Sequence, residues 1–108
     1  MKTLKYDEFL FESMKNEDVI IAYVNGATKA SSKHLYIEKA SKDTYGLKNY
    51  GTWLLYKTKE GDWLLNTKKY SVTTSKIQNY IKRNLTGINY IETDDEGIKT
   101  AIDIDYKV

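Results

Sequence analysis

Cysteine and proline are both absent from this 108-residue sequence, and histidine occurs once, at His34. Without cysteine the chain cannot form a disulfide, a thiolate metal site or a cysteine nucleophile. A single histidine also removes most zinc sites and Ser-His hydrolytic arrangements. No apolar run approaches the roughly 20 residues of a membrane span, and residues 1–8 lack the apolar stretch of a secretory signal. We therefore expect a cytoplasmic protein with no membrane partner, no metal and no cofactor.

The residues that are present fit one globular domain. Hydrophobic residues make up 41% and charged residues 30% of the chain, which is typical of a folded soluble protein. A chain of this length builds one modest core, so we interpret residues 1–108 as a single domain. The formal net charge is only +2, and attraction of the whole molecule to nucleic acid would be weak. Any basic function must come from local segregation of charge.

Hydrophobic spacing predicts helices and strands in the first two thirds of the chain. We expect a helix over residues 6–14, strands over residues 19–24 and 34–38, and a polar connection over residues 41–49. Two Trp-Leu-Leu runs, at residues 53–55 and 63–65, flank a turn that contains Gly61. Such a pattern predicts a β-hairpin that brings both tryptophans into one sheet.

The last third predicts a second helix and two more strands. The helix should begin near Thr74 or Ser75, bury Ile77, Ile81 and Leu85, and end at Gly87. Strands are expected over residues 88–92 and, with clean alternation of apolar and polar residues, over residues 98–108. The predicted fold class is therefore α+β, a single antiparallel sheet with two helices packed on one face.

Acidic residues offer little support for catalysis. Four acids fall within residues 92–96, but their spacing lacks the pattern of a calcium loop, and we interpret them as a solvated turn. Asp105-Tyr106-Lys107 has the acid-x-Lys form found at nuclease metal sites, with Asp94 or Asp95 as a second carboxylate. It falls at the polar face of a terminal strand, where a metal cage is not expected. We therefore predict a protein that is not an enzyme.

The most informative segment is basic. Residues 68–83 contain five cationic residues and no acidic one. Hydroxyls at residues 73–75 stand where the helix begins, Ser75 and Gln78 fit a capping box, and a helix N-terminus attracts phosphate. A tyrosine offers a stacking face. The candidate contact residues are Lys68, Lys69, Tyr70, Thr74, Ser75, Lys76, Lys82 and Arg83. The alternative is an ordinary helix cap with a solvated basic face.

Tyrosine is also abundant, with ten in the chain. This side chain joins apolar area to a hydrogen-bonding tip, a combination that protein interfaces favour. Tyr45, Tyr50 and Tyr56 lie near the tryptophan hairpin and offer a second possible contact surface. The alternative is that they are half-buried strand residues.

One resemblance covers Tyr50-Gly51-Thr52 and the stretch Leu65-Asn66-Thr67-Lys68-Lys69-Tyr70-Ser71-Val72-Thr73-Thr74-Ser75-Lys76-Ile77-Gln78. These residues resemble a group of short, uncharacterised proteins of phages and mobile elements with the signature YGT … LNT-x-KYS-x-TTSK-x-Q. The resemblance implies an accessory protein that acts in the cytoplasm of a host bacterial cell. It implies no role for any individual residue.

Two functions follow from these observations. In the first, the basic helix face binds DNA, RNA or a nucleic-acid-handling complex. In the second, the protein inhibits a bacterial defence system, in the manner of an anti-CRISPR protein, by binding a protein of that nucleoprotein complex. Mimicry of DNA would require a strongly acidic chain and is disfavoured. Nucleic-acid binding should weaken steeply with salt. An exposed edge strand at residues 98–108 would also allow a homodimer.

Overall fold

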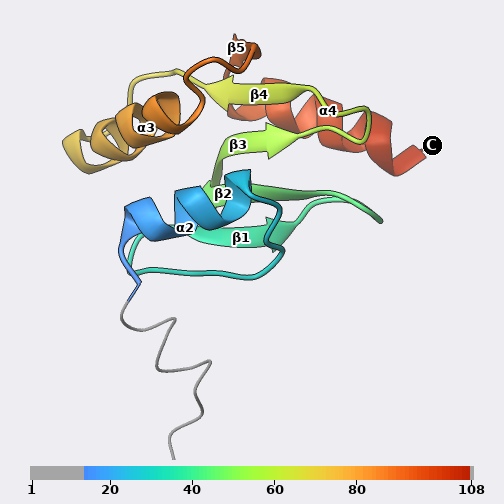
Figure 1. Ribbon diagram of the computed structural model, residues 1–108. Coiled ribbons are helices and arrows are strands. Elements are labelled where there is room, and N and C mark those ends of the chain that lie inside the picture. The colour runs from blue at the N-terminus through green and yellow to red at the C-terminus, as the bar shows by residue number, and fades with distance from the viewer. Residues whose placement is uncertain (1–13, 108) are drawn as a thin grey trace, which may run out of the picture.

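The computed structural model describes residues 14–107 (Figure 1). The helix predicted over residues 6–14 therefore lies outside the described residues, except for Met14. The described helices are α2 (Asn16–Val24), α3 (Val72–Asn84) and α4 (Asp95–Lys107). The strands are β1 (Tyr36–Lys39), β2 (Tyr45–Asn49), β3 (Thr52–Lys57), β4 (Trp63–Asn66) and β5 (Tyr90–Thr93).

All five strands form one sheet in the order β1-β2-β3-β4-β5. Neighbours from β1 to β4 are antiparallel, which includes the predicted tryptophan hairpin of β3 and β4. The pair β4 and β5 is parallel, because α3 returns the chain to the end of the sheet where β4 began. The α+β class with one sheet is thus confirmed, whereas a purely antiparallel sheet is wrong at its last pair.

An extra residue in β3 sorts side chains between the two faces of the sheet. Trp53 and Leu55 pair with consecutive residues of β2, so Leu54 has no partner of its own. A β-bulge of this kind places neighbouring side chains on the same side of the strand. Leu54 and Leu55 both enter the larger buried cluster, while Trp53 and Tyr56 enter a smaller one.

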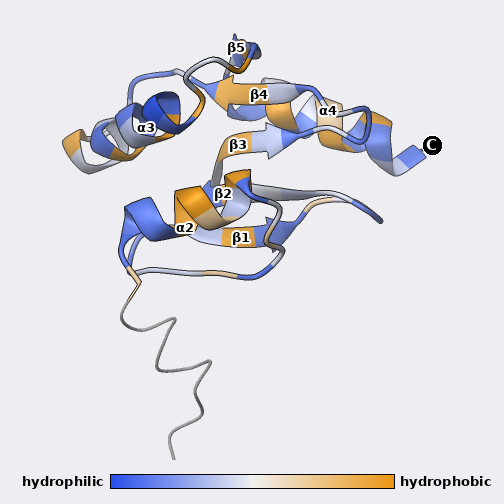
Figure 2. Cartoon of the chain, in the orientation of Figure 1, coloured by the Kyte–Doolittle hydropathy of each residue, from blue (hydrophilic) through white to orange (hydrophobic). Residues whose placement is uncertain are grey.

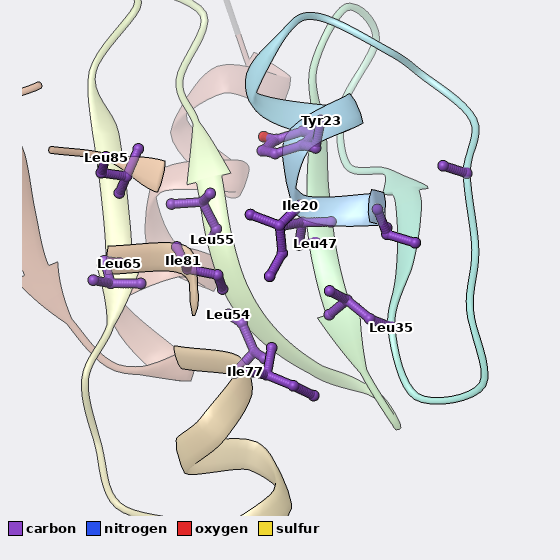
Figure 3. Packing of buried hydrophobic residues seen from close by; sticks show 12 residues of the cluster. Ile20, Tyr23, Leu35, Leu47, Leu54, Leu55, Leu65, Ile77, Ile81 and Leu85 are labelled. Atoms are coloured by element: carbon purple, nitrogen blue, oxygen red, sulfur yellow. The ribbon is translucent and has the colours of Figure 1, made fainter. Parts of the chain in front are cut away.

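The larger cluster fills the space between the sheet and the pair α2 and α3, as Figure 3 shows. Hydrophobic residues of α2, β1, β3 and β4 are orange in Figure 2. The fully buried members of the cluster are Val19, Ile20, Leu35, Leu47, Leu54, Leu55, Leu65, Ile77 and Ile81. Leu85 is almost fully buried beside them, which confirms the stripe predicted for the helix of the basic segment.

The smaller cluster lies under α4 on the opposite face of the sheet. It joins Trp53 and Tyr56 of β3 to Ile98 and Ile102 of α4. Successive residues of a strand point to opposite faces, and the next strand shows the same division, with Leu65 in the larger cluster and Leu64 against the smaller one. The prediction of two helices on one face is therefore incomplete, because a third helix covers the other face.

The segment predicted as a strand at residues 19–24 belongs instead to α2. Val19, Ile20 and Tyr23 are its buried residues, and their spacing places them on one side of a helix. Glu17 and Asp18 stand in the first turn, where acidic side chains are favourable. Burial of this stripe outweighs the weak strand preference of the β-branched residues.

The prediction of a strand at residues 98–108 is also wrong, because α4 occupies residues 95–107. Ile98 and Ile102 are buried, and they lie one helical turn apart as well as on one face of a strand. The homodimer expected from this edge strand loses its basis. Gly97 obscured the helix, but a Cβ there would lie 1.8 Å from Oγ1 of Thr93, so the tight passage from β5 into α4 requires glycine.

The connection predicted at residues 41–49 contains β2. A Cβ at Gly46 would lie 2.8 Å from Cζ3 of Trp53. The indole lies so close to β2 that only glycine fits under it, and Nζ of Lys48 lies 4.5 Å from the centre of the Trp53 ring. A glycine and a lysine within five residues conceal the strand in the sequence.

Candidate nucleic-acid interface

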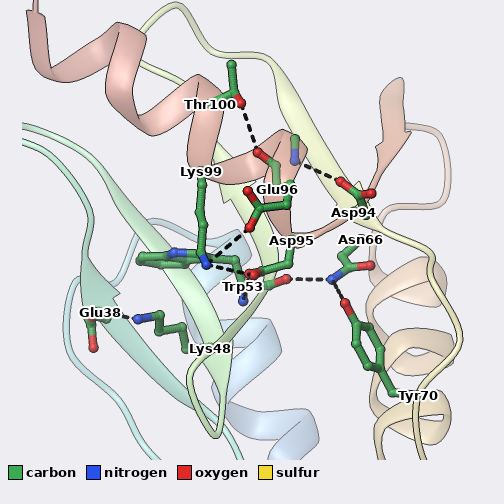
Figure 4. Close-up of polar contacts among 11 residues, drawn as sticks. Glu38, Lys48, Trp53, Asn66, Tyr70, Asp94, Asp95, Glu96, Lys99 and Thr100 are labelled. Carbon is green, nitrogen blue, oxygen red and sulfur yellow. Dashed lines mark hydrogen bonds and ion pairs between the residues drawn. The ribbon is translucent and has the colours of Figure 1, made fainter.

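Two buried amides fix the loop at residues 67–71 that precedes α3. The side-chain nitrogen of Asn66 donates to the carbonyl of Trp53 at 2.9 Å and to the hydroxyl of Tyr70 at 3.0 Å (Figure 4). Its side-chain oxygen accepts from the backbone N–H of Lys68 at 2.9 Å. The side-chain nitrogen of Gln78 donates to the carbonyls of Asn66 and Lys68 at 2.7 and 3.0 Å. These hydrogen bonds hold the loop between β4 and the side of α3.

The helix begins at Val72, two or three residues before its predicted start at Thr74 or Ser75. Ser71 is the N-cap, and its hydroxyl accepts from the backbone N–H of Thr74 at 3.2 Å. The capping box predicted from Ser75 and Gln78 is wrong, since Gln78 holds the loop instead. Thr74 is only 7% exposed, and its hydroxyl donates to the side chain of Asn49 at 2.9 Å. Of the candidate contact residues, Thr74 therefore serves the interior.

A groove of about 310 Å³ lies along α3 beside this loop. Its lining residues are Thr67, Lys69, Ser75, Gln78, Asn79 and Lys82. Ser75, Asn79 and Lys82 are spaced so that they lie on one side of the helix, while Lys69 approaches from the loop. The groove brings together three predicted contact residues, Lys69, Ser75 and Lys82, and among residues 14–107 no acidic side chain lines it.

The outer side of α3 continues this positive surface. Lys76 and Arg83 are exposed, and the guanidinium carbon of Arg83 lies 4.8 Å from the centre of the Tyr80 ring. Within residues 14–107, neither these two side chains nor Lys69 and Lys82 form an ion pair. Four cations therefore stand on or beside α3 without a compensating acid.

Lys68 and Tyr70 face a different hollow. This space of about 230 Å³ is lined by Thr52, Lys68, Tyr70, Asp94, Asp95 and Glu96. The acidic run that the sequence presented as a solvated turn thus lies beside these two residues. The structure therefore divides the predicted contact residues between two surfaces. Lys69, Ser75 and Lys82 line the groove along α3, whereas Lys68 and Tyr70 line a hollow whose carboxylates offset the charge of Lys68.

Part of that acidic run holds the fold together. One carboxylate oxygen of Asp95 accepts from the backbone N–H of Trp53 at 2.8 Å, and the other lies 3.2 Å from Nζ of Lys99 (Figure 4). The neighbouring carboxylates of Asp95 and Glu96 raise the pKa of Lys99. Asp95 therefore ties the start of α4 to β3.

The tyrosines near the hairpin have separate fates. Tyr56 is fully buried and Tyr50 is 74% exposed. Tyr50 stands at the turn between β2 and β3 with a φ of 57°, a conformation that costs a residue with a Cβ about 1–2 kcal/mol. Its hydroxyl lies 2.6 Å from Nδ1 of His34. Of the three tyrosines predicted as a rim, Tyr50 is the one that the fold presents to solvent.

Sequence reasoning missed Thr67 and Asn79 as groove residues. Asn79 follows Ser75 by four residues, and this helical spacing was the available signal. Thr67 has no comparable signal, because its position depends on the path of the loop over β4. Its backbone N–H donates to the carbonyl of Thr93 at 2.9 Å.

The acid-x-Lys pattern at residues 105–107 gives no metal centre. Asp105 is 8% exposed and accepts from the Tyr56 hydroxyl and from the backbone N–H of Lys59. Over residues 14–107, no three histidine, aspartate or glutamate side chains are grouped closely enough to hold a metal ion. In the same part of the chain, every helix is too short or too polar to span a bilayer.

The geometry of α3 offers cationic and hydrogen-bonding groups to an anionic chain. Lysine and arginine contact phosphates, and hydroxyl and amide groups add hydrogen bonds to the same oxygens. Comparisons with models of protein families, with curated protein sequences and with solved structures find no significant match. The function is therefore argued from the groove itself.

Proposed function

We propose that this chain is an accessory protein of a phage or mobile element that binds nucleic acid, alone or within a nucleic-acid-handling complex, through α3. The observation that carries the proposal is the convergence of Lys69, Ser75 and Lys82 on one groove that no acidic side chain of the described chain lines. In this arrangement Lys69 and Lys82 neutralise a backbone phosphate. The Ser75 hydroxyl and the Asn79 amide donate to its oxygens.

The rest of α3 defines the direction of the bound strand. Lys76 and Arg83 continue the positive surface around the helix, whereas the carboxylates of Asp94, Asp95 and Glu96 border the hollow of Lys68. A polyanion is repelled by that acidic border, so the strand runs from the groove around α3 and away from Lys68. Phosphate contacts of this kind position a strand but do not read its sequence, and weak sequence preference is expected.

The test is a fluorescence anisotropy titration with short single-stranded DNA, single-stranded RNA and duplex DNA. Binding should weaken steeply between about 50 mM and about 200 mM salt, because each phosphate contact releases counterions. The double variant Lys69→Glu, Lys82→Glu should lose the binding. Both side chains are exposed, so the fold should be retained.

The matched control is Lys39→Glu, Lys42→Glu. It makes the same change in net charge at two exposed lysines near β1, away from α3. Binding should stay close to that of the natural sequence. Equal losses in both double variants would mean that overall charge, and not the groove, attracts the nucleic acid. No binding even at low salt would contradict the proposal.

Tyr50 favours a second candidate function, inhibition of a host defence complex by protein–protein binding. A large side chain that is 74% exposed and held in a strained conformation is a frequent feature of contact sites. Tyr50→Asn removes the ring and suits the turn better. If this function is correct, the substitution should abolish inhibition of a defence nuclease and leave the salt-sensitive nucleic-acid binding unchanged.

A further inference from the structure

A second hollow lies between the turn that joins β3 to β4 and the C-terminal half of α4. Its volume is about 620 Å³, and its lining residues are Thr58, Lys59, Glu60, Asp62, Ala101, Ile104 and Asp105. Ala101 and Ile104 provide apolar wall, while three of the seven residues carry carboxylates and one, Lys59, carries an ammonium group. This cavity therefore combines apolar area with negative charge, unlike the groove on α3.

Asp105 stands at the buried end of the cavity. Its Oδ2 accepts from the hydroxyl of Tyr56 at 2.5 Å and from the backbone N–H of Lys59 at 3.0 Å. Its Oδ1 has no hydrogen-bond partner among residues 14–107. In that part of the chain no sealed side-chain oxygen or nitrogen lacks a partner, so Oδ1 reaches the open space of the cavity. The residue as a whole is only 8% exposed.

Buried hydroxyl groups next to Asp105 leave its Oδ1 available to accept a hydrogen bond, because one of them donates to Oδ2. The hydroxyls of Ser41, Thr44 and Tyr56 form a buried chain that ends at its carboxylate. Burial and the hydrogen bond to Asp105 raise the pKa of Tyr56 to about 12. The phenol therefore keeps its proton at neutral pH and donates to Oδ2, which leaves Oδ1 as the free acceptor of the pair.

We infer that this cavity binds a cationic group on an apolar stem, an alkylguanidinium or alkylammonium ion, with the cation at Oδ1 of Asp105 and the stem against Ala101 and Ile104. A carboxylate oxygen that opens into the cavity accepts most strongly from a cationic donor, because a charge-assisted hydrogen bond is stronger than a neutral one. The carboxylates of Glu60 and Asp62 at the same cavity add attraction for a cation. Arginine and lysine side chains carry this chemistry, as do small alkylamines.

The experiment follows backbone amide signals by NMR while n-butylguanidinium is added to the full chain, with neutral n-pentanol as the matched probe. Saturable shifts are expected at the amides of Lys59, Ala101 and Ile104. The alcohol should bind about tenfold more weakly or worse, because it lacks the charge-assisted hydrogen bond. Equal binding of the alcohol would overturn the inference, as would shifts confined to residues 92–96.

Asp105→Asn is the sharpest variant. Its amide oxygen can still accept from Tyr56 and Lys59, while its NH₂ group replaces Oδ1 and removes the charge. Affinity for n-butylguanidinium should fall about tenfold or more. Unchanged affinity would overturn the inference. If this variant does not fold, Ile104→Ser gives the second test, because Ile104 is 60% exposed and its loss should weaken binding of the stem without affecting the core.

A peptide with one internal arginine identifies the source of the cation. Displacement of n-butylguanidinium by this peptide assigns the site to a basic side chain of a protein. Retained binding of the small ion with no displacement assigns it to a free alkyl cation. Both outcomes support the site, and neither depends on the groove of α3.

Discussion

Helices α3 and α4 have the same length, thirteen residues, but opposite charge. The ionisable cationic residues of α3 are Lys76, Lys82 and Arg83, without an acid; α4 carries Asp95, Glu96, Asp103 and Asp105 against Lys99 and Lys107. The two helices cover opposite faces of one sheet. A net charge of +2 therefore conceals one positive and one negative helix on opposite faces of the sheet, which suits two ligands of opposite charge.

The packing beneath the two helices also differs. Among residues 14–107, the cluster under α2 and α3 has twelve buried members, and the cluster under α4 has four. The cavity of about 620 Å³ lies beside α4, on the side of the smaller cluster. Predictions that separate the two sides follow, from the largest effect to the smallest.

Truncation of the two cores should have unequal effects. Ile81→Ala removes a fully buried side chain from the larger cluster, and we expect unfolding free energy to fall by about 3–5 kcal/mol. Ile102 is 8% exposed in the smaller cluster, so Ile102→Ala should cost about 2 kcal/mol. Urea denaturation of both variants measures the difference. An equal or reversed order would contradict the view that the larger cluster dominates stability.

The side under α4 should respond to alkaline pH through Tyr56. Its pKa rises from 10.0 in a free side chain to about 12 in the fold, through burial and the hydrogen bond to Asp105. Because the folded pKa is raised, this contribution is complete below pH 10 and is lost as the pH rises toward 12. The effect should be smaller than loss of Ile81, since a single proton equilibrium is displaced.

The measurement is the urea midpoint from about pH 8 to about pH 11 in the natural sequence and in Tyr56→Phe. Tyr23 also has a raised pKa, chiefly through burial, and both proteins keep its contribution. Tyr56→Phe should therefore show a shallower decline and not a flat profile. If the urea midpoint declined equally with pH in both proteins, the pKa of Tyr56 would not be raised by folding.

The contrast between α3 and α4 also explains what the sequence could predict. Between Ile77, Ile81 and Leu85 stand the polar residues Asn79 and Arg83, which interrupt the alternation of a strand and leave only the helical pattern, so the sequence predicts α3. In α4, isoleucines at residues 98, 102 and 104 also fit strand alternation, and Gly97 looked like a turn. The clash that a Cβ would have with Thr93 explains this glycine, but such contacts between β5 and α4 exist only in the folded molecule.

The sequence predicts which basic and polar residues belong to the candidate site. It does not predict that the fold separates them into a groove along α3 and a hollow bordered by carboxylates. The charge of residues 68–83 was visible, and the groove collects Lys69, Ser75 and Lys82. That Lys68 and Tyr70 face carboxylates from residues 94–96 depends on the parallel pairing of β4 with β5, which the sequence did not indicate. The sequence also does not indicate the buried roles of Asn66 and Gln78. Both side chains bond to the backbone of the loop before α3, and those contacts exist only once the loop has folded.

The smallest expected effect compares the caps of the two helices. Ser71 caps α3 with a neutral hydroxyl, whereas Asp94 precedes α4 and accepts from the backbone N–H of Gly97 at 2.8 Å. Ser71→Ala and Asp94→Ala should each lower stability by about 1 kcal/mol. The aspartate also interacts with the positive end of the helix dipole, and salt screens that interaction. The cost of Asp94→Ala should therefore shrink in about 1 M salt while the cost of Ser71→Ala stays constant. Parallel salt responses would mean that charge contributes nothing to the start of α4.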